Sequence, residues 1–424
     1  MSVPGTGRDA EKVDVLVVGA GPAGSTAARH LAEAGYSVLL VEEHGRVGRP
    51  VQCAGLISDR ALRLAGSPDI VRRAVRGASV FGPGLRSISF KATEPRGYVI
   101  DRGALDVHLA DRAAAAGAEV RTATRFDRLL GPTNGRAMAQ LTGPDARTYS
   151  VAARLVVGAD GVASAVARAF RLRRPVEILP AFEAEFPDSP GDPDTVEVYL
   201  GRTFAPGLFG WWIPDGAGGA RVGLAADADG TSAREYFRRL LAHLERRFGR
   251  PLANATAYLV SGIPIGTVPR TYADRVVLVG DAAAQVKPLS GGGIYTGMRG
   301  GQLAAEVAAD ALRTDDLSAA SLARYARAWD AELGEEFRRA QYVRRVFTRL
   351  SDRELDALVD ALKDGSLAGT IVAFGDIDFP THVVRALLSE APSLVRLFPK
   401  ALGAWLSASS AYPAPDLEPG DRRK

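Results

Sequence analysis

The sequence is poor in the residues that build cross-linked or metal-stabilised proteins. Cys53 is its one cysteine, which excludes an intrachain disulfide, and also a zinc ribbon or iron–sulfur cluster held by this chain alone, because such sites need several thiolates. The five histidines are scattered, so we predict no metal site. No run approaches the roughly 20 apolar residues of a membrane span, and the first residues lack the apolar core of a signal peptide. These absences predict a cytoplasmic protein, which can also touch the inner face of a membrane peripherally without crossing it.

Strong charge is also lacking. The net charge is +4, it is spread along the chain, and no basic run with interleaved aromatic residues occurs. We therefore expect no nucleic-acid partner. The 424 residues, 46% of them hydrophobic, suffice for about two or three domains with a large core and exclude a disordered chain.

The first fifty residues carry the pattern of a dinucleotide-binding fold. A short apolar strand over 13–18 is followed by the glycine-rich turn GAGPAG at 19–24 and by a helix that ends near Gly35. A second strand over 37–41 then leads directly into Glu42. At about this spacing, this order of elements predicts a dinucleotide site: a strand, the G-x-G-x-x-G turn, a helix, a second strand and an acidic residue.

Each residue of this motif has a physical role. Gly19 allows the tight turn, Gly21 lets the backbone approach a pyrophosphate, and Gly24 lets the helix pack on the strand. The helix N-terminus, with its free N–H groups, faces the phosphates. Glu42 can accept hydrogen bonds from both ribose hydroxyls and would repel a 2′-phosphate, so the pattern favours FAD or NAD over NADP.

A second glycine-rich segment far downstream decides between FAD and NAD. A strand over 275–279 leads into Asp281 and then into a triple glycine at 291–293, which begins a helix running to about Leu312. NAD needs no such second anchor, whereas the ribityl chain and ring of FAD extend across the sheet. Asp281 would bond the ribityl hydroxyls, and the helix start would stabilise negative charge on the ring. We therefore predict FAD as the cofactor.

Three further positions have a cofactor role and an ordinary alternative. Lys287 either adds to the positive field at the ring or is a solvated loop lysine. Arg102, at the start of a helix running to about Ala115, either reaches the FAD phosphates or is a surface Asp-Arg helix start. Phe126, after a predicted strand over 118–122, is expected to lie under the adenine.

Motifs spread over nearly the whole chain carry a resemblance to a known family. They are GAGPAGS at 19–25, RPVQCAGLIS at 49–58, IDR at 100–102, GDAAAQVKPLSGGGIYTG at 280–297 and GDIDFP at 375–380. Together they resemble the geranylgeranyl reductase family, within the p-hydroxybenzoate-hydroxylase-like FAD superfamily. Motifs and resemblance together predict the following cofactor contacts: Gly19, Gly21, Ala23, Gly24, Glu42, Cys53, Ala54, Gly55, Arg102, Phe126, Asp281, Gly292, Gly293 and Ile294.

The family motif P-x-x-Y-x-W-x-F-P stands here as PGLFGWWIP at 206–214. Phe209 replaces the family's Tyr, and Ile213 replaces its Phe. Side chains repeat every two residues on a strand, so Phe209, Trp211 and Ile213 share one face, either as the lining of a channel for an apolar chain or as ordinary sheet core. We predict that these three bind the substrate, and the lost Tyr hydroxyl is consistent with a different prenyl substrate.

The predicted architecture is α/β, with a discontinuous Rossmann-like FAD-binding domain, a mainly antiparallel substrate sheet domain and a C-terminal helical region. The predicted bounds are 1–75, 96–175 and 268–315 for the FAD-binding domain, 76–95 and 176–267 for the sheet domain, 316–412 for the helical region and 413–424 for a disordered tail. The apolar residues of the helical region either pack as core or form a membrane-facing tunnel mouth.

The resemblance implies an FAD-dependent reductase that saturates geranylgeranyl-type double bonds of a prenyl lipid or prenylated metabolite. An isolated alkene accepts hydride poorly, so the reaction also needs an acid in a dry, shaped cavity. Cys53 and Tyr295 are the candidates by motif, with a small buried hydrophobe as the alternative for Cys53. Since no second dinucleotide motif follows a strand, we expect NAD(P)H bound transiently, or a protein electron donor such as ferredoxin.

Two other functions fit the same cofactor. A monooxygenase or halogenase of the superfamily would use oxygen, and FGWWIP at 209–214 partly resembles the halogenase motif W-x-W-x-I-P, although no counterpart of the catalytic lysine stands out. A non-catalytic FAD-binding scaffold is the third hypothesis. The gathering of motifs on the reactive side of the ring argues against it.

Overall fold

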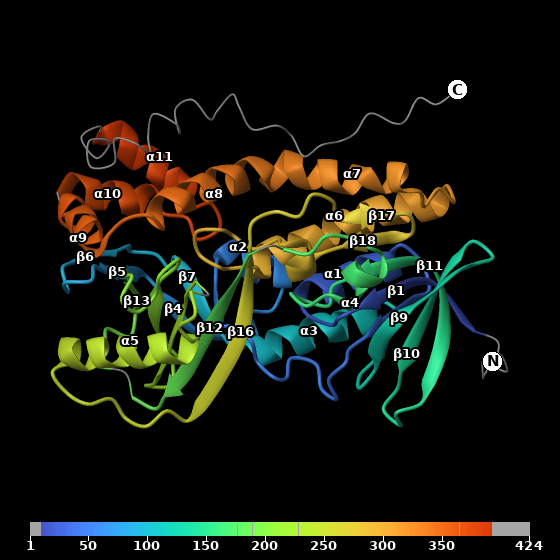
Figure 1. Ribbon diagram of the computed structural model, residues 1–424, viewed down its shortest axis with the longest axis horizontal. Helices are drawn as coiled ribbons and strands as arrows, with labels where there is room; N and C mark the ends of the chain where they lie inside the picture. The colour runs from blue at the N-terminus through green and yellow to red at the C-terminus, as the bar shows by residue number, and fades with distance from the viewer. Residues whose placement is uncertain (1–9, 176, 189, 228, 364, 392–424) are drawn as a thin grey trace.

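The computed structural model describes residues 10–175, 177–188, 190–227, 229–363 and 365–391. The predicted tail 413–424, and 392–412 of the predicted helical region, lie outside the described residues. The fold is α/β, as predicted, with two large sheets and a helical C-terminal part. Figure 1 shows the helices that follow residue 293 lying along one side of both sheets.

The first sheet contains the parallel strands of the predicted dinucleotide fold. Its path runs β17-β18-β11-β1-β2-β8, and β10 and β9 continue from β11 as an antiparallel hairpin. The bounds are β1 Glu11–Val18, β2 Val38–Val41, β8 Glu119–Arg121, β9 Arg125–Thr133, β10 Arg136–Thr142, β11 Thr148–Gly158, β17 Tyr272–Ala273 and β18 Val276–Leu278. β1 pairs in parallel with both β2 and β11. The predicted apolar strands are therefore central strands, buried on both faces.

The helices that pack on this sheet bring its two glycine-rich segments together. They are α1 Pro22–Glu33, α3 Arg102–Ala115, the short α4 Ala165–Ala169 and α6 Ile294–Arg313. α6 packs closely on α1, since a Cβ at Gly301 would come 2.4 Å from the Ala23 carbonyl oxygen. Leu31 of α1 and Leu303 of α6 lie in one core with Val15 and Val17 of β1. This packing fixes the N-terminus of α6 relative to the turn after β1.

The second sheet matches the predicted substrate sheet in character. Its order is β16-β12-β15-β14-β13-β5-β6, antiparallel apart from the parallel pair β13–β5. The bounds are β5 Gly77–Phe81, β6 Ser87–Lys91, β12 Glu177–Phe186, β13 Thr195–Tyr199, β14 Gly210–Pro214, β15 Ala220–Ala225 and β16 Ala257–Ile265. α5 (Ala233–Phe248), capped by Ser232, covers one face through Phe237, Leu240 and Leu244. The opposite face is free to line a cavity.

The remaining elements join the two sheets. A small sheet is formed by β3 Leu56–Ile57, β7 Gly97–Ile100 and β4 Val71–Val75, and the helices of this region are α2 Asp59–Ala65, η1 Pro68–Ile70 and η2 Gly280–Ala283. The C-terminal helices are α7 Ala319–Trp329, the π-helical turn η3 Asp330–Gly334, α8 Glu335–Phe347, α9 Asp352–Ala361, α10 Gly365–Phe374 and α11 Thr381–Glu390.

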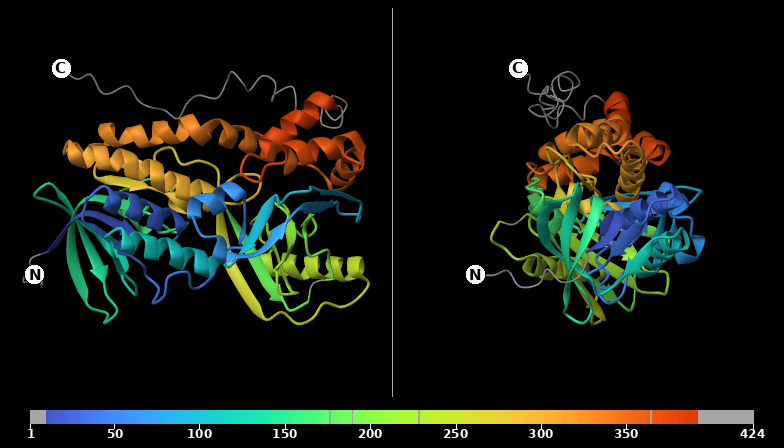
Figure 2. Two further views of the ribbon diagram at one scale, coloured as in Figure 1. Left: turned by 180° about the vertical axis from the view of Figure 1, so that it is seen from behind. Right: turned by 90° about the vertical axis from the view of Figure 1, so that its right-hand side faces the viewer.

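α9 and α10 pack against β6 at the edge of the second sheet, and the left view of Figure 2 shows these helices at that end of the molecule. Leu355 and Val359 of α9 and Ile371 of α10 share a core with Ile88 of β6. In the part of the chain that the structure describes, no helix is long and apolar enough to cross a membrane. The domain boundaries given above stay a prediction.

Candidate active site

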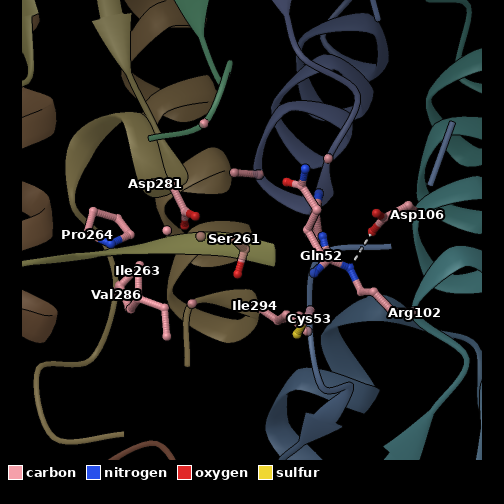
Figure 3. Close-up of a pocket in the computed structure, with 18 of the residues that line it drawn as sticks. Gln52, Cys53, Arg102, Asp106, Ser261, Ile263, Pro264, Asp281, Val286 and Ile294 are labelled. Atoms are coloured by element: carbon pink, nitrogen blue, oxygen red, sulfur yellow. Dashed lines mark hydrogen bonds and ion pairs between the residues drawn. The ribbon is translucent and has the colours of Figure 1, made fainter. Parts of the chain in front are cut away.

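A cavity of about 920 Å³ lies where the two sheets meet. Its walls come from the turn after β1, the loop over 48–56, the segment from β18 to α6, and strands β12, β14 and β16. Figure 3 shows two of these walls facing each other, with Ser261, Ile263 and Asp281 on one side and Cys53 and Arg102 on the other.

Among the predicted site residues, all but Gly24 and Tyr295 line this cavity. Gly24 lies behind the turn, where a Cβ would come 2.0 Å from the Gly19 carbonyl oxygen, so only glycine lets α1 begin there. Tyr295 packs against Phe379, with ring centroids 6.4 Å apart. Because Tyr295 does not line the cavity, its role as a proton donor stays a prediction.

Two glycines of the turn after β1 differ in whether the protein leaves room for a side chain. Gly19 has no such room, whereas Gly21 has. Gly19 has a φ of +102°, and a Cβ there would come 2.3 Å from the Ala159 carbonyl oxygen. Gly21 has an extended backbone (φ −72°, ψ −179°), and its Cβ would meet no atom within 4 Å. Gly21 is also the N-cap of α1, and no side chain caps this helix. The space beside Gly21 therefore suits a ligand that accepts hydrogen bonds from free N–H groups.

Glu42 lies beside this turn, at the carboxyl end of β2. Its Oε2 accepts a hydrogen bond from the Ala20 backbone N–H at 3.0 Å, and its Oε1 accepts one from the His44 backbone N–H at 3.1 Å. The carboxylate is thus held at the cavity edge, the position from which an acid reaches a ribose in dinucleotide folds.

Asp281 and the start of α6 form the second predicted anchor. Burial raises the pKa of Asp281, and the positive charge of Arg102 opposes this rise. Within the described residues, no hydrogen bond reaches the Asp281 carboxylate. α6 begins at Gly293 without a side-chain cap, whereas α2 and α5 are capped by serines. The Asp281 carboxylate can accept hydrogen bonds from hydroxyl groups, and it lies beside a helix start that is open to a ligand. This pair fits a sugar-like chain that ends in an electron-rich ring.

The loop that carries Cys53 is held by Arg221 and lies beside Arg102. Arg221 on β15 donates from Nη1 to the Ala54 carbonyl oxygen at 2.8 Å and to the Ile100 carbonyl oxygen at 3.0 Å. On the opposite side, Arg102 donates from Nε to Asp106 Oδ1 at 2.8 Å. Burial opposes charge on Arg102, but the Asp106 carboxylate outweighs it and raises the pKa of Arg102. A fixed cation therefore stands beside the Cys53 loop.

The three residues predicted to bind the substrate lie together at the cavity. Trp211 and Ile213 are on β14 and Phe209 immediately precedes it, and all three line the cavity. Ile213 belongs to a small apolar core against which Trp211 of the same strand and Ala54 and Leu56 of the Cys53 loop pack. This apolar wall thus adjoins the segment predicted to contact the ring.

Sequence reasoning missed Glu183, an acid on the same wall. It lies on β12, only 3% exposed, and Trp211 Nε1 donates a hydrogen bond to its Oε2 at 2.7 Å. Burial raises the pKa of Glu183 to about 7. The alternation of FEAEF at 182–186 could have revealed it, because Glu183 falls on the face opposite Phe182, Ala184 and Phe186.

Of the two alternatives for Lys287, the solvated loop lysine is wrong. Lys287 is buried, and its Nζ donates to Asp378 Oδ1 at 2.9 Å and to the Ile377 carbonyl oxygen at 2.8 Å. Ser58 donates to the other Asp378 oxygen. The charge of Lys287 is thus balanced by Asp378 instead of adding freely to the field at the ring. The cluster joins three motifs, at 49–58, 280–297 and 375–380.

Comparison with known proteins agrees with this geometry. Residues 12–332 match a family described as "FAD binding domain". The chain is similar to digeranylgeranylglycerophospholipid reductase 2 of Methanothermobacter thermautotrophicus, with 37% identity over 91% of this chain and 98% of the relative. A geranylgeranyl bacteriochlorophyll reductase-like structure from Thermoplasma acidophilum matches with a TM-score of 0.80 and 28% identity, over 92% of this chain and 98% of that one. A flavin-dependent halogenase shares the fold, with a TM-score of 0.67 and 18% identity over 92% of this chain and 78% of that one.

Proposed function

Because this chain belongs to the FAD-binding domain family, and within it to the family of the digeranylgeranylglycerophospholipid reductases, we propose that it is an FAD-dependent reductase of geranylgeranyl-type double bonds in a prenyl lipid. The observation that carries this proposal is the cavity itself. One continuous space joins two helix starts without side-chain caps to an apolar wall made by Phe209, Trp211 and Ile213.

The residues present fit FAD. The open space at Gly21 and the start of α1 would take the pyrophosphate, with Glu42 at the ribose and Phe126 at the adenine. The free carboxylate of Asp281 would accept bonds from the ribityl hydroxyls. When bound and reduced, FAD supplies the hydride that an alkene carbon needs.

The residues that line the cavity would hold the alkene near the ring and exclude water. The remaining predicted contacts, Arg102, Gly292, Gly293 and Ile294, border the same space as the Cys53 loop. Arg221 fixes that loop through the Ala54 carbonyl oxygen, so Cys53 would contact the ring at a constant position. The aromatic wall would lie against the isoprenoid chain and exclude water around the alkene.

Product mass tests the proposal. Purified protein, a digeranylgeranyl glycerophospholipid and a reductant are incubated, with NADH, NADPH and reduced ferredoxin compared as electron donors. We expect products heavier by two hydrogens for each alkene, because hydride and proton add across the bond. Products that carry added oxygen or halogen would assign the chain to the monooxygenase or halogenase alternative, and unchanged lipid with every donor would favour the non-catalytic scaffold.

We also propose that the protein is cytoplasmic and touches a membrane peripherally to reach its substrate. A glycerophospholipid with two C20 chains resides in a bilayer, and the net charge of +4 favours an anionic surface. We expect the protein to sediment with vesicles of anionic phospholipid at low salt and to be released at high salt. Protein that stays in the supernatant at every salt concentration contradicts this contact.

A further inference from the structure

Glu183 is a carboxyl group set into a mostly apolar part of the cavity wall. Trp211, Gly223 and Glu183 lie in register on the adjacent strands β14, β15 and β12. The Trp211 indole lies over Gly223, where a Cβ would come 2.5 Å from its Cζ2 atom. The missing side chain at Gly223 thus lets the indole cross the middle strand and donate its Nε1–H to Glu183 at 2.7 Å.

Opposing effects act on the charge of this group, and burial is the largest. Burial raises the pKa of Glu183 to about 7, and the neighbouring Glu185 adds to the rise. The hydrogen bond from Trp211 and the positive charge of Arg221 on β15 work the other way. From the other walls, the titratable groups Cys53, Arg102, Asp281 and Lys287 also border the cavity. A bound cofactor and lipid would remove further water and favour the neutral acid more strongly.

The geometry points to Glu183 as the residue that gives the alkene its proton, an assignment that rests on the proposed reductase function. It is a buried carboxyl group on the cavity wall, Trp211 donates to one of its oxygens, and no hydrogen bond from the residues that the structure describes reaches the other. A neutral carboxylic acid is the form that an apolar cavity tolerates without a partner cation.

The step balances as an addition of H₂ across one double bond. One alkene carbon gains a C–H bond with the hydride delivered from the reduced cofactor. The π electrons form a second C–H bond at the neighbouring carbon with the proton from Glu183. Glu183 is left as a carboxylate and regains a proton from solvent, and the electron donor of the proposed function supplies the two electrons for the next cycle.

Replacing Glu183 by glutamine tests the assignment, with Glu185→Gln as a matched control on the same strand. Glutamine keeps the volume and can accept the Trp211 hydrogen bond, but it has no acidic proton. Each holoenzyme is reduced without oxygen and mixed with a prenyl lipid, and the return of oxidised flavin absorbance is followed. We expect E183Q to be slower by about 10²–10⁴-fold, as for loss of a general acid, and E185Q, which keeps the acid at position 183, to change the rate far less. The wild-type rate should fall at pH above the raised pKa.

Thermal stability against pH gives a readout that does not depend on turnover. A raised pKa in the folded state stabilises the wild type below the unfolded pKa of glutamate, and that stability is lost as pH rises towards the folded value of about 7. E183Q lacks this loss, so its melting temperature relative to that of the wild type should rise between pH 4.5 and about 7 and stay constant at higher pH.

The outcomes separate the two levels of the proposal. An E183Q enzyme that reduces the lipid at the wild-type rate overturns the role of Glu183. A slow E183Q enzyme whose stability follows pH as the wild type does also overturns it, because Glu183 then holds no extra proton. If no prenyl lipid reoxidises the wild type, the reductase function itself fails and the assignment falls with it.

Discussion

Replacing Gly21 by valine is expected to leave the protein folded and to remove most of its affinity for FAD. The backbone at Gly21 is extended, which any residue adopts, and a Cβ would meet no protein atom within 4 Å. A valine side chain would instead fill the space in front of the N-terminus of α1. Loss of two hydrogen bonds to phosphate, at roughly 1.5 kcal/mol each, corresponds to weakening by about 100-fold.

Flavin absorbance of the purified variant and titration with FAD measure this effect, and circular dichroism checks the fold. Gly45→Val is the matched control, because a Cβ at Gly45 also meets nothing within 4 Å but Gly45 does not line the cavity. G45V should keep wild-type affinity. A yellow G21V protein with unchanged affinity would show that the cofactor does not lie at this turn.

Breaking the buried pair between Lys287 and Asp378 should destabilise the protein strongly. The two side chains are only 6% and 1% exposed, so removing either one leaves an uncompensated buried charge. Such a loss costs about 3–5 kcal/mol of the free energy of unfolding. We therefore expect Lys287→Met and Asp378→Asn each to lower stability by this amount, as measured by guanidinium unfolding.

The double variant shows whether the two groups act as a pair. K287M/D378N removes both charges, so it should lose clearly less stability than the sum of the single variants. Lys363→Met serves as the control, because Lys363 and Asp360 are 3.0 Å apart but 46% and 33% exposed. Such a surface pair contributes about 0–1 kcal/mol. Strictly additive losses at positions 287 and 378 would contradict the pairing.

The parts of the fold that depend on local pattern could be predicted from the sequence. The strand, glycine turn and helix after Val13 follow from apolar runs and glycine spacing, and the spacing of Phe209, Trp211 and Ile213 places them on one face. The hairpin of β9 and β10 also has a local signal, because Asn134-Gly135, between its strands, is typical of a tight turn.

The parts of the fold that depend on contacts between segments far apart in the sequence could not be predicted. Lys287 and Asp378 meet only because the C-terminal helices fold back over the loop before α6, and neither local sequence reveals the other as its partner. Glu183 is similar, since its environment comes from Trp211 and Gly223 on two other strands. Its strand pattern shows which face it occupies, but burial and the resulting rise in pKa require the folded sheet.

The most direct test of flavin-dependent prenyl reduction follows the colour of the protein without oxygen. Purified holoenzyme is reduced until its yellow absorbance disappears, and then receives either a digeranylgeranyl lipid or the same lipid with fully saturated chains. We expect the unsaturated lipid to restore the oxidised flavin spectrum, with one double bond lost for each flavin, and the saturated lipid to leave the protein colourless. If the protein binds no flavin, or if its reduced flavin is not reoxidised by the unsaturated lipid, this cavity does not reduce prenyl chains.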